Sequence, residues 1–232
     1  MTNATHAVHA PAVSPSVARA EAARYALLRR LAPCMRHHLV VNLQPIGMIH
    51  EVMERRLRAT EPDLAQVKES ALKINGFARA ALTACLDIVT WLAPDEAATV
   101  TVADGVGECI GLLATSLSFR GYSVRNQVAA LPGEVRRTAI RNVLTAALLH
   151  ATDQSSPPSD LVLTARADPA GLRLALILKA VDGTRGFTNE ADYRKIDWGD
   201  VMALSEAESV RVEHEEQGLH MLIPWAPQPG SR

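Results

Sequence analysis

The chain has 232 residues, with 24 Lys and Arg against 25 Asp and Glu, and a formal net charge of −1. With 48% hydrophobic and 21% charged residues, the chain has the composition of a folded protein and not of a disordered one. Its near-neutral charge balance gives no reason to expect binding to nucleic acid or to an anionic membrane. No apolar run reaches the roughly 18 residues that span a bilayer, and Met1–Val13 lack the pattern of a secretory signal. Three scattered cysteines without a CxxC pair predict reduced core thiols and a cytoplasmic protein.

The N-terminal part predicts a tail followed by a long helix. Residues 1–15 show no hydrophobic period and are expected to be disordered, and Ser14-Pro15-Ser16 gives a helix start. Pro33 and Pro45 are each expected to kink the helix or remove one of its hydrogen bonds, unless Pro33 begins a separate helix. The helix, roughly 60 Å long, is predicted from apolar residues at Leu28, Leu31, Met35, Leu39, Leu43, Ile46, Ile49, Met53 and Leu57.

A second helix is predicted from about Pro62 to Leu92, with Thr60 as its cap. Its apolar positions follow a strict 3-4 spacing that is typical of a packing seam. Two antiparallel helices with one seam each cannot bury themselves alone, so a second copy is expected to complete a homodimeric four-helix bundle. The nine seam positions are Leu64, Val67, Ala71, Ile74, Ala78, Ala81, Cys85, Ile88 and Leu92.

After Pro94-Asp95 the pattern changes to alternating strands and shorter helices. The expected order is β-α-β-α-β-β-α-β-β, an α+β fold with a mixed sheet and helices on one face. The domain assignment is a tail at 1–15, a helical hairpin at 16–94, a sheet domain at 95–226 and a tail at 227–232. The expected strands are 99–103, 123–128, 161–167, 172–180, 210–213 and 219–223, and the expected helices are 104–119, 134–151 and 198–209.

Two adjacent histidines lie midway along the first helix. At about 100° per residue, the apolar positions of this helix cluster about one direction, His37 lies nearly opposite it, and His38 lies on its flank. His37 is therefore expected to face water on a rigid helix, where a neutral imidazole can act as a nucleophile. Taken alone, a single surface histidine is most often only a solvated side chain.

The segment Arg36-His37-His38-Leu39-Val40-Val41-Asn42-Leu43-Gln44 resembles the phosphoacceptor box of HWE-type histidine kinases, whose pattern is His-Arg-Val-Lys-Asn-Asn-Leu-Gln. His37, Asn42, Leu43 and Gln44 match, and a shift of one residue lets His38 take the place of His37. Together with the predicted hairpin and sheet domain, the chain is also similar to dimeric histidine phosphotransferases. The resemblance implies that His37 is the phosphoacceptor, with His38, Asn42 and Gln44 in support. It implies a response-regulator receiver domain as partner, which supplies the Mg²⁺.

The second domain resembles a Bergerat-type ATPase domain of the GHKL group with degenerate motifs. In the family, Asn-Leu-Leu-x-Asn-Ala holds Mg²⁺ through its second Asn, but here Asn142 is followed by Ala146, which has no oxygen to offer a hard cation. The family's Asp-x-Gly-x-Gly reads Asp182-Gly183-Thr184-Arg185-Gly186. Asp182, the residue that would meet an adenine, is present, although a plain surface turn explains this stretch equally well.

The glycine-rich lid of the family is also reduced. Its counterpart, residues 195–202, keeps Gly199 between Asp197 and Asp200, two carboxylates that would repel a triphosphate. We therefore expect no cofactor and no metal site, with weak nucleotide binding through Asp182 left open. The predicted function is histidine phosphotransfer through His37 without ATP-dependent autophosphorylation. The alternatives are a non-catalytic pseudokinase scaffold that binds a response regulator or a kinase, and an atypical active histidine kinase.

Overall fold

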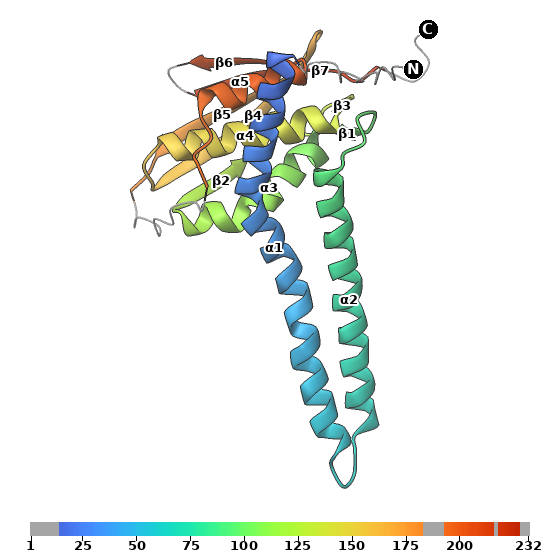
Figure 1. Cartoon of the computed structure of the whole chain (residues 1–232). Helices are drawn as coiled ribbons and strands as arrows, with labels where there is room; N and C mark the ends of the chain where they lie inside the picture. The colour runs from blue at the N-terminus through green and yellow to red at the C-terminus, as the bar shows by residue number, and fades with distance from the viewer. Residues whose placement is uncertain (1–13, 183–192, 216–217, 228–232) are drawn as a thin grey trace, which may run out of the picture.

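The computed structural model describes residues 14–182, 193–215 and 218–227. Its most prominent feature is a helical hairpin that extends from a compact sheet domain (Figure 1). Helix α1 runs from Pro15 to Leu57 without a break, with Pro33 and Pro45 inside it, so the alternative of a separate helix beginning at Pro33 is wrong. Ser14 caps its first turn, accepting the N–H of Val17 at 3.4 Å. The predicted tails, apart from 14–15 and 227, lie outside the described residues.

Helix α2 spans Leu64–Leu92 and runs antiparallel to α1 (Figure 1). Its cap is Asp63, whose carboxylate accepts the N–H groups of Ala65 and Gln66 at 3.0 and 3.2 Å. The expectation of Thr60 as the cap is therefore wrong. A carboxylate at this position also interacts favourably with the positive end of the helix dipole, which a threonine hydroxyl cannot do.

The predicted seam of α2 divides between two faces. Its members Val67, Ile74 and Ile88 are half-buried and Ala81 is buried, and they lie on the face toward α1. The remaining members are exposed within a single chain, because the hairpin has no further helix to cover them. These exposed members are Leu64, Ala71, Ala78, Cys85 and Leu92.

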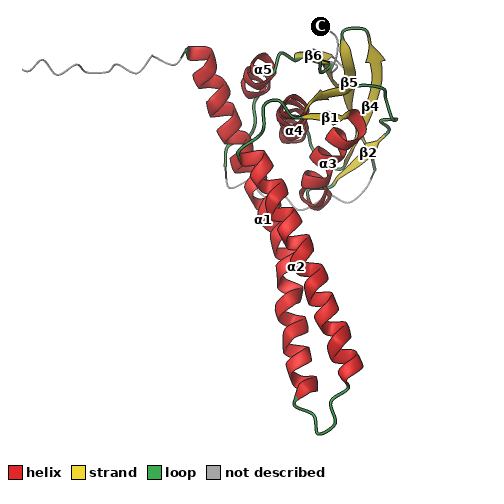
Figure 2. Ribbon diagram, turned by 90° about the vertical axis from the view of Figure 1, so that its right-hand side faces the viewer, coloured by secondary structure: helices red, strands yellow, loops and turns green. Residues whose placement is uncertain are grey.

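The sheet domain contains a five-stranded mixed sheet with helices on one face (Figure 2). The strand order is β2-β4-β5-β7-β6, with β2 and β4 parallel and the other neighbours antiparallel. This α+β fold confirms the predicted fold class. The strands are β2 Tyr122–Asn126, β4 Ser159–Asp168, β5 Gly171–Ala180, β6 Arg211–Glu215 and β7 Gly218–Pro224, and the helices are α3 Val102–Phe119, α4 Arg137–Gln154 and α5 Trp198–Ala207.

A second, two-stranded sheet differs from the predicted arrangement. β1 covers only Thr99–Thr101, and it pairs antiparallel with β3, Glu134–Arg136, rather than with the main sheet. Residues 134–136 were expected to begin a helix, which in fact starts at Arg137. The tertiary environment explains the difference, because Val135 is fully buried opposite Val100 and a strand places its side chain in the core.

Tight turns join the strands of the main sheet where the sequence predicts hairpins. Asp168 accepts the N–H of Ala170 at 2.9 Å at the turn between β4 and β5. Gly171 follows, and a Cβ there would lie 2.2 Å from the carbonyl oxygen of Ile223, so only glycine fits. The last hairpin is also present, although its predicted turn at Gln217 lies outside the described residues.

Helix α3 is long and apolar enough to cross a membrane by length and composition, which contradicts the expectation that no such segment exists. In the structure it packs on α4 and β2. Val106, Cys109, Leu113 and Leu117 on its inner face are all at most 1% exposed. These contacts are those of a core helix within the sheet domain.

The first half of α1 belongs to the core of the sheet domain. Ala26, Leu27 and Leu31 are at most 1% exposed and share one hydrophobic cluster with α3, α4, α5 and the sheet. Both figures show this part of α1 lying beside the sheet-domain helices, whereas its second half continues into the free hairpin (Figures 1 and 2). The domain division at residue 95 remains a prediction, and the structure adds this shared core to it.

Two buried ion-pair clusters fix α1 to the sheet domain. Arg30 donates two hydrogen bonds to Asp153 of α4, at 2.6 and 2.8 Å, and Arg120 donates a third at 3.1 Å. In the second cluster, Glu208 accepts from Arg24 of α1 at 3.3 Å and lies 3.5 Å from a guanidinium nitrogen of Arg136. Because Asp153 and Glu208 are nearly inaccessible to water, the hydrogen bonds and charges of their partners have to compensate for the burial of each carboxylate.

Candidate functional site

His37 lies on the outer surface of α1, where the hairpin leaves the sheet domain. Its side chain is exposed, and no described residue forms a hydrogen bond or ion pair with it. The helical-face prediction of a water-facing imidazole is confirmed, whereas the role of His37 as phosphoacceptor remains a prediction. An unpaired imidazole on a continuous 43-residue helix is open to attack a group brought by another protein.

The neighbouring residues of the predicted box have different environments. His38 is half-buried, and its carbonyl oxygen accepts the side-chain amide of Asn42 at 2.9 Å. That bond directs the Asn42 side chain to the backbone of its own helix rather than to His37. Gln44 is exposed. The accessibility difference favours His37 over His38 as the reacting imidazole.

Apolar side chains flank His37 on the same side of α1. Rotation of about 100° per residue brings Val41, Met48 and Val52 to the flank that carries His37. They are 45%, 62% and 39% exposed. Together with His37, we call them the His37 flank. An exposed apolar strip of this kind is suited to a transient protein contact.

The opposite flank of the hairpin carries a larger apolar surface. On α1 it includes Leu43 and Leu57, 52% and 46% exposed, and on α2 it includes Leu64, Leu82 and Val89, 70%, 61% and 50% exposed. Because the helices are antiparallel, these residues of both helices lie on one side of the hairpin. We call them the hairpin face. His37 points to the other side.

The residues expected to bind a nucleotide and its metal ion either form hydrogen bonds within the protein or have no side-chain oxygen. Asn142 donates to Glu208 at 2.7 Å within the second ion-pair cluster. Ala146 is fully buried in the core, which leaves no room for a metal-binding side chain without repacking. Asp182 is exposed beyond the end of β5, and the rest of the predicted Asp-x-Gly-x-Gly segment, 183–186, lies outside the described residues.

The two aspartates of the predicted lid have structural partners. Asp197 caps α5 by accepting the N–H of Asp200 at 2.9 Å, and the Asp200 side chain accepts the N–H of Asp197 at 3.1 Å. Asp200 also accepts from Arg194 at 2.5 and 2.8 Å. Burial by itself raises the pKa of Asp200, but the Arg194 and Asp197 hydrogen bonds outweigh it and lower that pKa. Both carboxylates therefore order the start of α5.

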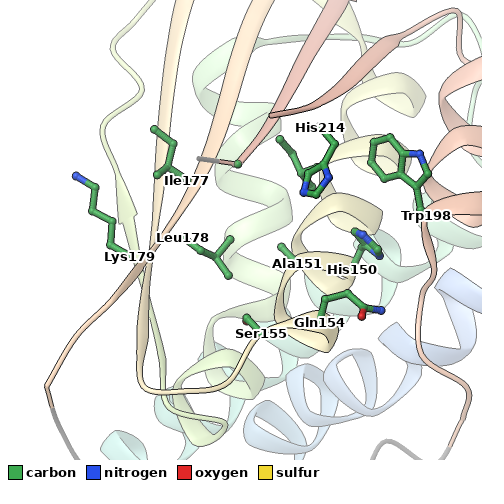
Figure 3. A pocket seen from close by; sticks show the side chains of 11 residues that line it. His150, Ala151, Gln154, Ser155, Ile177, Leu178, Lys179, Trp198 and His214 are labelled. Atoms are coloured by element: carbon green, nitrogen blue, oxygen red, sulfur yellow. The ribbon is translucent and has the colours of Figure 1, made fainter. Parts of the chain in front are cut away.

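A cavity of about 820 Å³ lies between the C-terminal end of α4, the end of β5 and the start of α5 (Figure 3). The sequence alone does not predict this cavity, because its walls come from segments up to 69 positions apart. Asp182 is not among the lining residues. The lining residues are His150, Ala151, Gln154, Ser155, Ile177, Leu178, Lys179, Trp198, His214, Gly218 and Leu219.

The described residues contain no cluster of three or more His, Cys, Asp or Glu side chains that could hold a metal ion. Cys34 and Cys109 are buried, and burial raises the pKa of both thiols, to about 12 for Cys109. Cys85 is exposed on α2, so the expectation that all three cysteines are core residues is wrong for Cys85. The three described thiols are all free, as the sequence predicts.

The chain combines a helical hairpin with a mixed sheet whose helices lie on one face. No family model matches the sequence, and no curated protein matches it. Among solved structures, the chain is similar to the Acinetobacter baumannii histidine kinase AdeS, with 13% identity, coverage of 79% of this chain and 98% of the other, and a TM-score of 0.44.

Two further similarities extend over most of the chain. A histidine kinase from Burkholderia phymatum is 16% identical, with coverage of 92% of this chain and 99% of the other and a TM-score of 0.43. Histidine kinase ThkA in complex with response regulator protein TrrA is 13% identical, with coverage of 96% and 70% and a TM-score of 0.40.

Proposed function

We propose that the chain is a cytoplasmic two-component signalling protein that transfers phosphoryl groups through His37 to or from a receiver domain, without ATP-dependent autophosphorylation. The observation that carries the proposal is the exposed His37 imidazole, free of described partners, within the Asn42 and Gln44 pattern of α1. A rigid helix presents the imidazole in a fixed direction, which lowers the entropic cost of meeting a second reactant.

The reaction needs little from the chain beyond a positioned nucleophile. A ring nitrogen of neutral His37 attacks the phosphorus of a receiver aspartyl phosphate, a P–N bond forms, and the P–O bond to the aspartate breaks. The carboxylate leaves as an anion, and the ring keeps its proton on the other nitrogen. The reverse step delivers the phosphoryl group to a second receiver, whose own Mg²⁺ offsets the charge that develops.

The His37 flank supports docking of the receiver. Val41 lies about one helical turn from His37, and Met48 and Val52 lie further along the same flank, so a partner that buries these exposed side chains can bring its own reactive side chain to His37. Because these residues lie on the flank away from the hairpin face, a receiver can dock on the His37 flank while a second copy covers the hairpin face.

We also propose that the hairpin face pairs two copies into a four-helix bundle. A single hairpin leaves Leu43, Leu64, Leu82 and Val89 at least half exposed, which costs free energy in water and is offset when a second copy covers them. A twofold arrangement pairs this face with itself and keeps both His37 side chains in solvent.

Charge placed in the hairpin face is expected to dissociate the dimer. Leu82→Glu buries a carboxylate without a partner in the bundle, which costs about 3 kcal/mol and weakens the dimer about a hundredfold. Leu72→Glu is the matched control, because Leu72 is 62% exposed on the same helix but points away from α1 and from the hairpin face. Light scattering at micromolar concentration should give a monomer for Leu82→Glu and a dimer for Leu72→Glu. A monomeric wild type would contradict the bundle.

The residues at the expected nucleotide positions support the proposed absence of ATP-dependent autophosphorylation. Phosphoryl transfer from ATP depends on positioning and on charge neutralisation by Mg²⁺. Ala146 offers no metal ligand, Asn142 is bound to Glu208, and Asp197 and Asp200 stabilise the helix that follows. These residues do not fit a magnesium-bound triphosphate.

Two labelled donors separate the candidate functions. We expect the wild type to gain acid-labile label from a phosphorylated receiver and none from labelled MgATP. Binding of the receiver without label would support a scaffold in place of a relay. Label from MgATP alone would identify an atypical kinase and would show that the loss of the metal ligand at Ala146 had been compensated.

A further inference from the structure

The His37 flank of α1 faces the same side of the hairpin as the sheet domain (Figure 2). Four residues that follow one another at intervals of seven lie close to one line along this helix. They are Leu27, Cys34, Val41 and Met48. Leu27 and Cys34 are buried in the core shared with the sheet domain, whereas Val41 and Met48 are 45% and 62% exposed. The strip by which α1 packs on the sheet domain therefore continues, past the edge of that domain, into the His37 flank.

The C-terminal end of α3 lies at this same edge of the sheet domain. Arg30 of α1 and Arg120, the residue that caps α3, both donate to the carboxylate of Asp153, at 2.6 and 3.1 Å. His37 follows Arg30 by seven residues, so it lies on nearly the same line of α1, about 10 Å further along. Phe119 precedes Arg120 and is 63% exposed. An exposed aromatic side chain and the exposed imidazole thus belong to two adjoining surfaces.

A short apolar rim follows this edge of the sheet domain. Among its described residues, Phe119 and Val181 are the only large hydrophobic side chains that are exposed, 63% and 38% respectively. Their segments meet at the ends of β2, β4 and β5. The N–H of Ser159 donates to the carbonyl oxygen of Gly121, and the N–H of Val181 donates to that of Pro158, both at 3.3 Å. We call Phe119 and Val181 the domain rim.

We propose that the receiver that exchanges a phosphoryl group with His37 also docks on the domain rim, with Phe119 as its main anchor. This inference rests on the proposed function. A specific protein interface takes roughly 20–30 residues on each side, more than one flank of a helix supplies, and the domain rim is the exposed apolar surface that adjoins the His37 flank. Contact with two surfaces that meet at an angle also fixes the orientation of the receiver toward the imidazole.

The anchor is tested by truncating its ring and following single-turnover transfer at increasing receiver concentration. Phe119→Ala should raise the receiver concentration that gives the half-maximal rate about tenfold and leave the maximal rate of transfer unchanged. Leu72→Ala is the matched control, because Leu72 is 62% exposed on the side of α2 away from α1, and it should change neither value. An unchanged half-maximal concentration in Phe119→Ala, or an effect on the maximal rate alone, would overturn the proposal.

Titration calorimetry with the unphosphorylated receiver separates this inference from the relay. Phe119→Ala should bind that receiver about tenfold more weakly than the wild type, and Leu72→Ala should bind it equally well. A wild type that binds the receiver but gains no label would reject the relay and leave the docking surface to this comparison. Equal affinity of the wild type and Phe119→Ala would reject the docking surface. A monomeric Phe119→Ala in light scattering would assign the domain rim to the second copy and would also overturn the proposal.

Discussion

Substituting His37 by glutamine is expected to reduce phosphotransfer from a phosphorylated receiver to background, while the matched His38→Gln variant keeps the activity of the wild type. Glutamine has no nitrogen that can form a stable phosphoryl adduct, and its size and helix propensity suit this position on α1. His37 is exposed and His38 is half-buried with its carbonyl bound by Asn42, so the two substitutions separate the two imidazoles.

The comparison requires that both variants fold as stably as the wild type. Because the His37 side chain has no described contact, thermal unfolding of His37→Gln should match the wild type. Loss of transfer in His38→Gln with full activity in His37→Gln would move the phosphoacceptor by one residue, as the alternative alignment of the box allows. Full activity in both variants would reject a relay through this segment.

The second large effect is on stability, and it comes from Asp153. Asp153→Asn should lower the free energy of unfolding by about 3–5 kcal/mol, because Arg30 then stays buried without its counter-charge. Arg30 and Asp153 have side chains that are 5% and 3% exposed, so water cannot replace the lost bonds. Glu69→Gln, which removes an exposed pair with Lys73, should leave stability nearly unchanged, because solvent screens this pair. Chemical denaturation measures both variants.

The Asp153 carboxylate also makes the free energy of unfolding depend on pH in the acid range. Burial by itself raises the pKa of Asp153, but its hydrogen bond with Arg30 and the charges of Arg30 and Arg120, together with the Ile196 N–H, outweigh burial and lower that pKa. The contribution is complete above the ordinary value of 3.8 and is lost as the pH falls through the lower folded-state value. Asp153→Asn should lack this part of the pH dependence. The same loss of stability at acid pH in the wild type and in Asp153→Asn would contradict this role of Asp153.

The hairpin and the main sheet were predictable because their signals are local. A run of apolar residues at helical spacing survives two prolines in α1, since a long helix loses only isolated hydrogen bonds there. The alternation of apolar and polar residues in β4 and β5, with Gly171 at the turn, is likewise a local signal and indicates a hairpin. The water-facing position of His37 followed from helix geometry alone.

Other features depend on contacts between distant parts of the chain. The bond between Arg30 and Asp153 joins residues 123 positions apart, and neither residue type predicts burial. β3 was expected to be helical because its pairing with β1 across more than 30 residues leaves no local pattern. The division of the α2 seam between two faces likewise requires knowledge of where α1 lies.

Localisation of the phosphoryl group on the wild-type protein tests the central claim most directly. After incubation with a phosphorylated receiver, cleavage at arginine should release the peptide from His37 to Arg55, and fragmentation at neutral to basic pH should place the phosphoryl group on the His37 imidazole. The same peptide should stay unmodified after incubation with MgATP alone. A phosphoryl group on another residue, or one gained from MgATP without a receiver, would contradict the account.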